Sequence, residues 1–205
     1  MLKINHLELK LGEQTWQHHL QVEAGELVVI MGGSGSGKST LLNAIAGFLP
    51  VTSGSILVKG QAIQDLPPEE RPVSYLFQQQ NFFEHLSIET NLKLGFAKGK
   101  PSQAEWQQVL KACDLLEVTP LLKRLPSKLS GGQQQRLALI RSVLRPMPVV
   151  LLDEPFSALD DDLRQVAGKW LQGEIKNSGR VALLVTHRQA DADALADQLL
   201  ILEGS

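Results

Sequence analysis

The sequence has little cysteine, no strong excess of charge and no long apolar run. Its single cysteine, Cys113, cannot form an internal disulfide and has no CxxC companion, so neither a disulfide scaffold nor a cysteine zinc site is supported. The net charge is -2 with a pI near 6.2, which gives no chain-wide basic field for nucleic acid. The apolar runs at 27–31 and 181–185 are far shorter than the ~20 residues that a membrane-spanning helix needs. We expect a cytosolic protein with no nucleic-acid partner, whose association with a membrane goes through another protein.

The first residues, MLKINHLELK, alternate apolar and polar side chains and lack the charged stretch followed by an apolar stretch of a signal peptide. They predict a strand. With 205 residues and 43% hydrophobic composition the chain can bury a core of its own. We expect one domain that can carry an inserted lobe. Cys113, among apolar neighbours, is expected to be a small buried core residue.

Short strands and helices alternate along most of the chain. Strands with alternating burial are expected at 3–9, 18–22 and 55–59. An apolar strand at 27–31 is followed by a helix after Gly37. Parallel strands buried on both faces are expected at 73–77, 149–152, 181–185 and 199–202. The fold class is α/β, with a parallel sheet and an N-terminal antiparallel β subdomain.

Between residues 84 and 125 the apolar spacing becomes helical. Ser102 followed by Glu105 forms a capping-box pattern just ahead of an apolar stripe that contains Trp106 and Cys113. We therefore expect a helical insertion at 84–125, inside an α/β core made of 1–83 and 126–205.

The segment GGSGSGKST fits the phosphate-loop pattern and lies between an apolar strand and a helix. Glycines let successive backbone N–H groups approach phosphate oxygens, and the helix adds its positive end. Lys38 is expected at the β- and γ-phosphates of ATP, and Ser39 at Mg²⁺. The expected nucleotide contacts are Gly32, Gly33, Ser34, Gly35, Ser36, Gly37, Lys38, Ser39 and Thr40.

The segment VVLLDEP ends an apolar strand in two carboxylates, at the sheet edge where ligands gather in open α/β folds. Asp153 is expected to hold Mg²⁺, through water. Glu154 is expected to orient and deprotonate the attacking water, a general-base contribution of roughly 10² to 10⁴ in rate.

A second anion site is expected in LSGGQQQR, where Ser130, Gly131, Gly132 and Gln133 open a helix from about residue 133 to 144. One nucleotide needs only one phosphate loop. The second helix end is therefore interpreted as serving the nucleotide of a partner subunit.

With these motifs the chain resembles the nucleotide-binding subunits of ABC transporters over essentially all of its length. The resemblance rests on GGSGSGKST, LFQ, LSGGQ, LLDEP, SALD and a histidine at a strand end. It implies two domains that pair head to tail, with ATP between the phosphate loop of one and the LSGGQ segment of the other. It also implies roles for Gln78 at Mg²⁺ and the attacking water, for the SALD loop ending at Asp160 at the dimer interface, and for His187 at the γ-phosphate.

The chain departs from the family at three positions. Gly33 stands where many members have proline, which alters loop stiffness. Arg188 follows the switch histidine where an acidic residue is common. The usual aromatic that stacks on adenine is missing, because a gapless reading places Leu11 there. Two interpretations of Trp16 stay open: it stacks on adenine, worth on the order of 1 to 3 kcal/mol, or it is simply packed.

Within the family the chain is similar to importers fed by a periplasmic binding protein, and most similar to the ATPase subunit of thiamine importers, through RPVSYLFQQQNFFEHLSIETN and AGFLP. That resemblance implies a homodimer or a pair with a paralogue, bound to integral membrane permease subunits at the cytoplasmic face of the inner membrane. Phe82 and Phe83 either form part of the cleft for the permease or pack inside the helical lobe. Because the sequence stops at Ser205, no C-terminal regulatory domain is expected.

Other members of the family remain alternatives. The ATPase could drive a ferric iron, polyamine or molybdate importer, or an exporter. A non-transport ABC ATPase would need coiled coils, DNA-binding additions or a second such domain, and an inactive subunit would be expected to lack Lys38, Glu154 or His187.

Overall fold

Two β-sheets and the helix between them form the first of the two units into which the chain divides. The structure is a computed structural model that describes residues 1–78 and 82–203. The first unit comprises Met1–Tyr75, Met147–Glu154 and Gln172–Ser205, and the second comprises Leu76–Pro146 and Pro155–Leu171. The chain therefore enters each unit more than once.

The antiparallel sheet contains the amino terminus and has the strand order β2-β1-β4-β5. Its strands are β1 (Leu2–Leu11), β2 (Gln14–Val22), β4 (Ser53–Val58) and β5 (Gln61–Ala62). Alternate side chains of β2 are buried, as the alternating sequence predicts. The register of β1 shifts at His6, whose φ is 44°, and Gly54 of β4 lies so close that a Cβ there would meet the His6 carbonyl oxygen. This bulge needs glycine at position 54.

The second sheet has the strand order β6-β7-β8-β3-β9. Its strands are β3 (Leu27–Gly32), β6 (Val73–Leu76), β7 (Val149–Asp153), β8 (Val181–Val185) and β9 (Gln198–Leu202). The pairs β7–β8, β8–β3 and β3–β9 are parallel. Gly32, Asp153 and Val185 therefore end neighbouring parallel strands at one edge, where α/β folds bind ligands.

The apolar segment at the C-terminal end of the chain corrects one expectation. We expected it to be buried on both faces, and β7 and β8 are indeed buried throughout. In β9, however, Leu199 and Ile201 are 47% and 63% exposed. β9 is the last strand of the sheet, and the face to which these two side chains belong is largely open to solvent.

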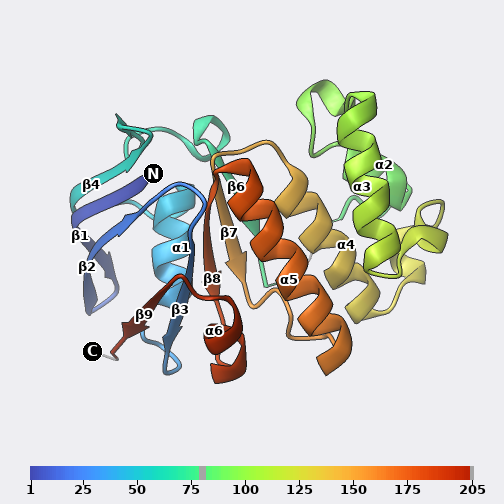
Figure 1. Cartoon of the computed structure of the whole chain (residues 1–205). Helices are drawn as coiled ribbons and strands as arrows, with labels where there is room; N and C mark the ends of the chain where they lie inside the picture. The colour runs from blue at the N-terminus through green and yellow to red at the C-terminus, as the bar shows by residue number, and fades with distance from the viewer. Residues whose placement is uncertain (79–81, 204–205) are drawn as a thin grey trace. The chain divides into compact units, whose positions relative to one another are not determined.

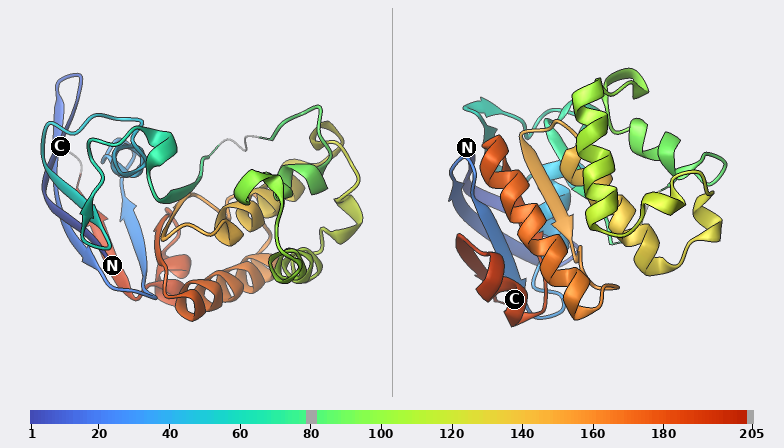
Figure 2. Two further views of the ribbon diagram at one scale, coloured as in Figure 1. Left: turned by 90° about the horizontal axis from the view of Figure 1, so that it is seen from above. Right: turned by 45° about the vertical axis from the view of Figure 1, so that its right-hand side comes forward.

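The helix α1 (Lys38–Ala46) packs between the two sheets, and Figures 1 and 2 show it beside β3, the strand that precedes it. One apolar core joins its buried face to β1, β2, β3, β7 and β8. At its carboxyl end the Arg71 guanidinium, only 6% exposed, donates hydrogen bonds to the backbone oxygens of Ala44, Ile45, Gln64 and Leu66. A buried cation that neutralises helix carbonyls fixes this end of α1.

The remaining helix of the first unit is α6 (Gln189–Leu195), and α5 (Asp161–Ser178) runs from the second unit into the first. None of the helices in residues 1–78 and 82–203 is both long and apolar enough to cross a membrane.

The second unit is helical and contains α2 (Ile88–Lys93), α3 (Gln103–Leu115) and α4 (Gly131–Leu144) (Figure 2). Short 3-10 helices are η1 (Pro68–Glu70) in the first unit and η2 (Ala97–Gly99), η3 (Thr119–Leu121) and η4 (Pro126–Lys128) in the second. The capping box of Ser102 and Glu105 forms as predicted. The unit contains more of the chain than residues 84–125, because α4 packs against α2 and α3. Cys113 is buried as expected, and burial raises the pKa of its thiol to about 12.

Candidate functional site

The phosphate loop connects β3 to α1 and depends on glycine at several positions. Gly32, Gly35 and Gly37 have φ values of 151°, 79° and 89°, which other residues rarely adopt. Gly37 is the N-cap of α1 and offers no side-chain cap, so the first N–H groups of the helix are not taken by a side chain of that residue. The loop thus has the form of an anion cradle.

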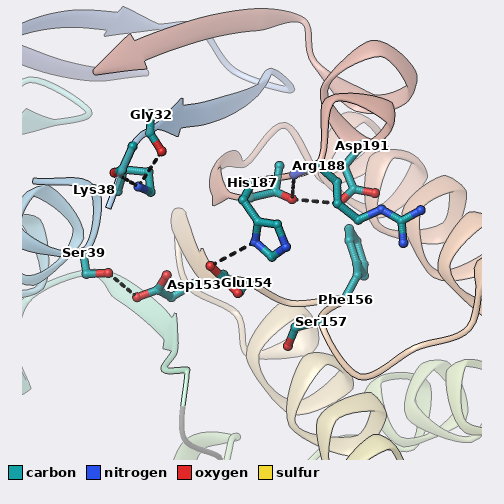
Figure 3. A network of polar contacts seen from close by, with 12 residues as sticks. Gly32, Lys38, Ser39, Asp153, Glu154, Phe156, Ser157, His187, Arg188 and Asp191 are labelled. Atoms are coloured by element: carbon teal, nitrogen blue, oxygen red, sulfur yellow. Dashed lines mark hydrogen bonds and ion pairs between the residues drawn. The ribbon is translucent and has the colours of Figure 1, made fainter. Parts of the chain in front are cut away.

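Lys38 turns back over this loop. Its Nζ donates hydrogen bonds to the carbonyl oxygens of Gly32 at 2.8 Å and Gly33 at 2.6 Å, as Figure 3 shows for Gly32. The ammonium group is therefore already held at the mouth of the cradle, where an anionic phosphate would be a stronger acceptor.

Ser39 and Asp153 meet at the carboxyl edge of the parallel sheet. Ser39 Oγ donates to Asp153 Oδ2 at 2.8 Å (Figure 3). Burial raises the pKa of Asp153, while the hydrogen bond from Ser39 opposes that rise. A cation at this point would favour the ionised carboxylate.

Glu154 is held in an unusual backbone conformation beside His187. Its φ is 49°, a left-handed value, and its N–H donates to the Val185 carbonyl at 3.0 Å. Glu154 Oε1 lies 3.2 Å from His187 Nδ1 (Figure 3). The His187 side chain is 64% exposed and that of Glu154 is 24% exposed. The Glu154 carboxylate is thus partly accessible, and the strained backbone sets the direction of its side chain.

Hydrogen bonds of the Thr186 side chain hold the turn that carries His187. Thr186 Oγ1 donates to Asp191 Oδ2 at 2.8 Å and accepts from the Arg188 N–H at 3.1 Å. Asp191 is 6% exposed. The sequence analysis missed Thr186 and Asp191 as supports of the histidine. The position of Arg188 in this turn gives no account of its departure from the acidic residue common in the family.

The donor set of this site fits MgATP. Ser39 and Asp153 supply hard oxygen ligands, and Lys38 with the loop N–H groups supplies positive charge for phosphates. No cluster of three or more His, Cys, Asp or Glu able to hold a metal occurs in the described residues. A site with few protein ligands suits Mg²⁺, which keeps water and phosphate oxygens as its other ligands.

The start of α4 lies in the second unit and forms a capping box. Ser130 Oγ accepts from the Gln133 N–H at 3.3 Å, and the Ser130 N–H donates to Gln133 Oε1 at 3.0 Å. A Cβ at Gly132 would come within 2.8 Å of the Ala158 carbonyl oxygen, whereas one at Gly131 would meet nothing within 4 Å. The helix begins at Gly131, two residues before the start predicted from sequence.

A glutamine that the sequence analysis did not single out joins α4 to the SALD loop. Gln135 is 3% exposed; its Nε2 donates to Ser157 Oγ at 2.8 Å and its Oε1 accepts from the Ala158 N–H at 2.7 Å. Asp160 ends the loop by accepting the Leu163 N–H at the start of α5. The neighbours of Gln135 in the QQQR run are equally polar, so the sequence could not indicate which of them would be buried against the SALD loop.

The comparisons with known proteins agree with this geometry. A family model described as ABC transporter matches residues 17–157, more than half of the chain. The chain belongs to the ABC transporter family. The expected fold class and family resemblance are therefore confirmed, and the protein is an ATP-binding, ATP-hydrolysing cassette.

Curated relatives share more than two fifths of their aligned residues with this ABC cassette. The thiamine import ATP-binding protein ThiQ of Vibrio cholerae serotype O1 is 42% identical over 203 residues, covering 98% of this chain and 85% of the relative. ThiQ of Escherichia coli strain K12 is 43% identical over 202 residues, covering 95% and 87%.

Solved ABC cassettes have the same fold. The dimeric structure of a bacterial ABC transporter cassette matches with a TM-score of 0.86 and 30% identity over 99% of this chain and 94% of that chain. A dimeric post-hydrolysis cassette bound to ADP and Pi matches with a TM-score of 0.84 and 29% identity over 100% and 97%.

Several residues with roles implied by the ABC family belong to the second unit. Gln78 follows β6 in a bend and is exposed. Phe83 is 53% exposed, while Phe82 is half-buried beneath Arg141, whose Cζ lies 4.7 Å from the ring centroid. The intervening residues of the QQQNFF run, 79–81, lie outside the described residues. Of the two phenylalanines, Phe83 presents the more open apolar surface.

Trp16 of this ABC cassette is 7% exposed and lies in the core that joins the sheets to α1. It borders a hollow of about 450 Å³ lined by β2, β9 and Ser36 of the phosphate loop. Leu11, the last residue of β1, is 55% exposed. Of the two interpretations of Trp16, its burial favours packing, because so little of the ring is open to a base.

Proposed function

We propose that this chain is the ATPase subunit of a thiamine importer and works as a pair of cassettes, each completing the other's nucleotide site. The observation that carries the pairing is that one chain holds two glycine-rich helix starts, at α1 and α4, each of which could bind a phosphate. The identity to ThiQ proteins supports thiamine as the cargo. The partners are a second copy or a paralogue, the permease, and indirectly a periplasmic binding protein.

In this proposal the phosphate loop binds the triphosphate through its N–H groups, with the backbone from Gly32 to Thr40 around the β- and γ-phosphates. Lys38 exchanges its carbonyl contacts for the phosphates, which are charged and therefore stronger acceptors. Ser39 and Asp153 would hold Mg²⁺, with Gln78 as a further proposed ligand, and the ion would neutralise charge on the phosphates.

Glu154 acts as the general base that aligns the attacking water. Its left-handed backbone aims the carboxylate, and His187 Nδ1 at 3.2 Å can hold it before the nucleotide arrives. His187 then contacts the γ-phosphate. Ser130, Gly131, Gly132 and Gln133 of the second copy close the site from the other side, and Asp160 lies at the interface.

The permease contacts the second unit at a cleft that includes the exposed Phe83. Through this contact the ATPase is a peripheral protein of the cytoplasmic face of the inner membrane. Hydrolysis reverses the pairing and moves the permease.

The test is the specific ATPase activity of the purified chain over a range of protein concentrations. A paired engine predicts that specific activity rises with concentration, and that Glu154→Gln loses ~10²-fold or more of turnover while forming an ATP-dependent dimer on a sizing column. Unchanged turnover in Glu154→Gln would remove it as the base.

A mixing experiment tests the shared site directly. Ser130→Arg and Lys38→Ala subunits are each expected to be inactive alone. Their mixture should regain activity, because each heterodimer keeps one intact composite site and loses the other. A mixture as inactive as its components would contradict the proposed sharing.

Reconstitution in proteoliposomes identifies the transported molecule. With the permease and binding protein of a thiamine importer, thiamine uptake should require this chain and MgATP. Uptake of ferric iron, polyamine or molybdate with their permeases, or export, would instead select another ABC system.

A further inference from the structure

Trp16 lies against the phosphate loop. A Cβ built at Gly37 would stand 2.7 Å from Trp16 Nε1 and 2.8 Å from its Cδ1, closer than real Cβ atoms approach other atoms. The edge of the indole therefore occupies the space that a side chain at position 37 would need. The strand β2, through this one residue, is in contact with the backbone of the loop.

The helix start has no side-chain cap at this point. Gly37 is the N-cap of α1 in the left-handed conformation, and no side-chain cap holds it there. A glycine is free to leave such a conformation at low cost. The indole restricts that freedom because movement of Gly37 toward β2 is blocked.

The indole does not contribute through a hydrogen bond. Trp16 Nε1 is fully buried and has no hydrogen-bond partner among the described residues. Buried donors are usually paired. A residue that keeps an unpaired donor beneath the phosphate loop acts there by its shape.

We infer that Trp16 is a positioning residue of the phosphate loop. It holds Gly37 so that the N–H groups at the start of α1 face the phosphates before the nucleotide binds. Its contribution is therefore the same for any ligand that carries a triphosphate, with or without a base. This inference rests on the proposed phosphate site and is opposite to stacking on adenine, which would act on the base alone.

The test compares two ligands and two substitutions by titration calorimetry of the purified chain. Dissociation constants are measured for MgATP and for magnesium tripolyphosphate, which lacks base and sugar. Trp16→Leu should weaken both by the same factor, on the order of tenfold, because a displaced loop misplaces the same donors in both cases. Trp16→Phe, which keeps a ring against Gly37, should restore both.

Fluorescence gives a readout that a purely structural role would not change. In the chain with Trp106→Phe and Trp170→Phe, Trp16 is the only tryptophan. Its emission should change on addition of magnesium tripolyphosphate and saturate at the dissociation constant from calorimetry. The matched control keeps Trp106 alone, through Trp16→Phe and Trp170→Phe, and should not respond to tripolyphosphate.

The outcomes separate the possibilities. Weakening of MgATP alone would assign Trp16 to the base, and weakening of neither ligand, or a silent Trp16 emission, would overturn the inference. If Trp16→Leu does not fold, as judged by circular dichroism, the emission of the single-tryptophan chain decides. Failure of the wild-type chain to bind either ligand would instead refute the phosphate site itself.

Discussion

The two helix starts of this chain present their N-termini in different ways. α1 begins at a left-handed glycine without a side-chain cap, held against Trp16. α4 begins at Ser130, whose side chain already accepts from the Gln133 N–H. At the start of α1 no side chain of the N-cap residue occupies the first N–H groups, and the conformation is supported by a residue of the core, Trp16. The second is stabilised locally and exposes its residues.

The space around Gly32 of the phosphate loop differs from that around Gly131 at the start of α4. A Cβ at Gly32 would lie 2.3 Å from the Leu202 carbonyl oxygen, whereas one at Gly131 would lie in open space. The first glycine of the phosphate loop therefore lies directly against the backbone of β9. At Gly131 the start of α4 has room for an added Cβ, which is what a surface awaiting a partner requires, whereas Gly132 packs against the Ala158 carbonyl of its own unit.

The largest effect is expected from Gly32→Ala. The strained φ of 151° and the collision with the backbone of β9 should lower the free energy of unfolding by about 3 kcal/mol, and ATP binding should be lost. Urea denaturation and calorimetry measure both. The matched Gly131→Ala should leave the free energy of unfolding unchanged; equal damage from both would erase the contrast between the two starts.

A smaller effect is expected from Gln135→Leu. This change leaves the Ala158 N–H and Ser157 without the buried partner they now have, so the free energy of unfolding should fall by about 1–3 kcal/mol. ATP binding to the isolated chain should persist, because the phosphate loop belongs to the other unit. Loss of binding would show that the two regions are not separable.

The two capping boxes sharpen the comparison further. Ser102→Ala and Ser130→Ala each remove one N-cap of the same geometry and should each cost about 1 kcal/mol in the free energy of unfolding. Only Ser130→Ala should also lower the ATPase rate. A similar loss of rate in Ser102→Ala would mean that helix stability, and not phosphate contact, sets the activity.

The smallest effect concerns His18, two residues after Trp16 on the buried face of β2. Burial lowers its pKa below the ordinary value of 6.5. As the pH falls, His18 is therefore protonated more readily in the unfolded chain than in the folded one. The free energy of unfolding should fall as the pH drops through 6.5. His18→Gln should flatten that slope in urea denaturation measured across this pH range, and a slope unchanged by the substitution would contradict the prediction.

Much of the site could be predicted from sequence because its groups are adjacent in the chain. The phosphate loop, the carboxylates after β7 and the capping box at Ser102 depend on local spacing, and each was found at its predicted place. The contacts of Gln135 and Thr186 could not be predicted, because their partners are chosen by the packing of separate segments.

The sequence by itself determined the family, the α/β class and the place of the phosphate-loop motif between β3 and α1, since motif spacing and apolar periodicity depend on neighbours in the chain. Only the tertiary structure decided that Trp16 is buried against Gly37 and which face of β9 is left open. Burial of a side chain is set by the segments that pack on it, and Trp16 meets Gly37 only because β2 lies beside the phosphate loop. An alternating strand looks the same in sequence whether its tryptophan faces a base or supports a loop.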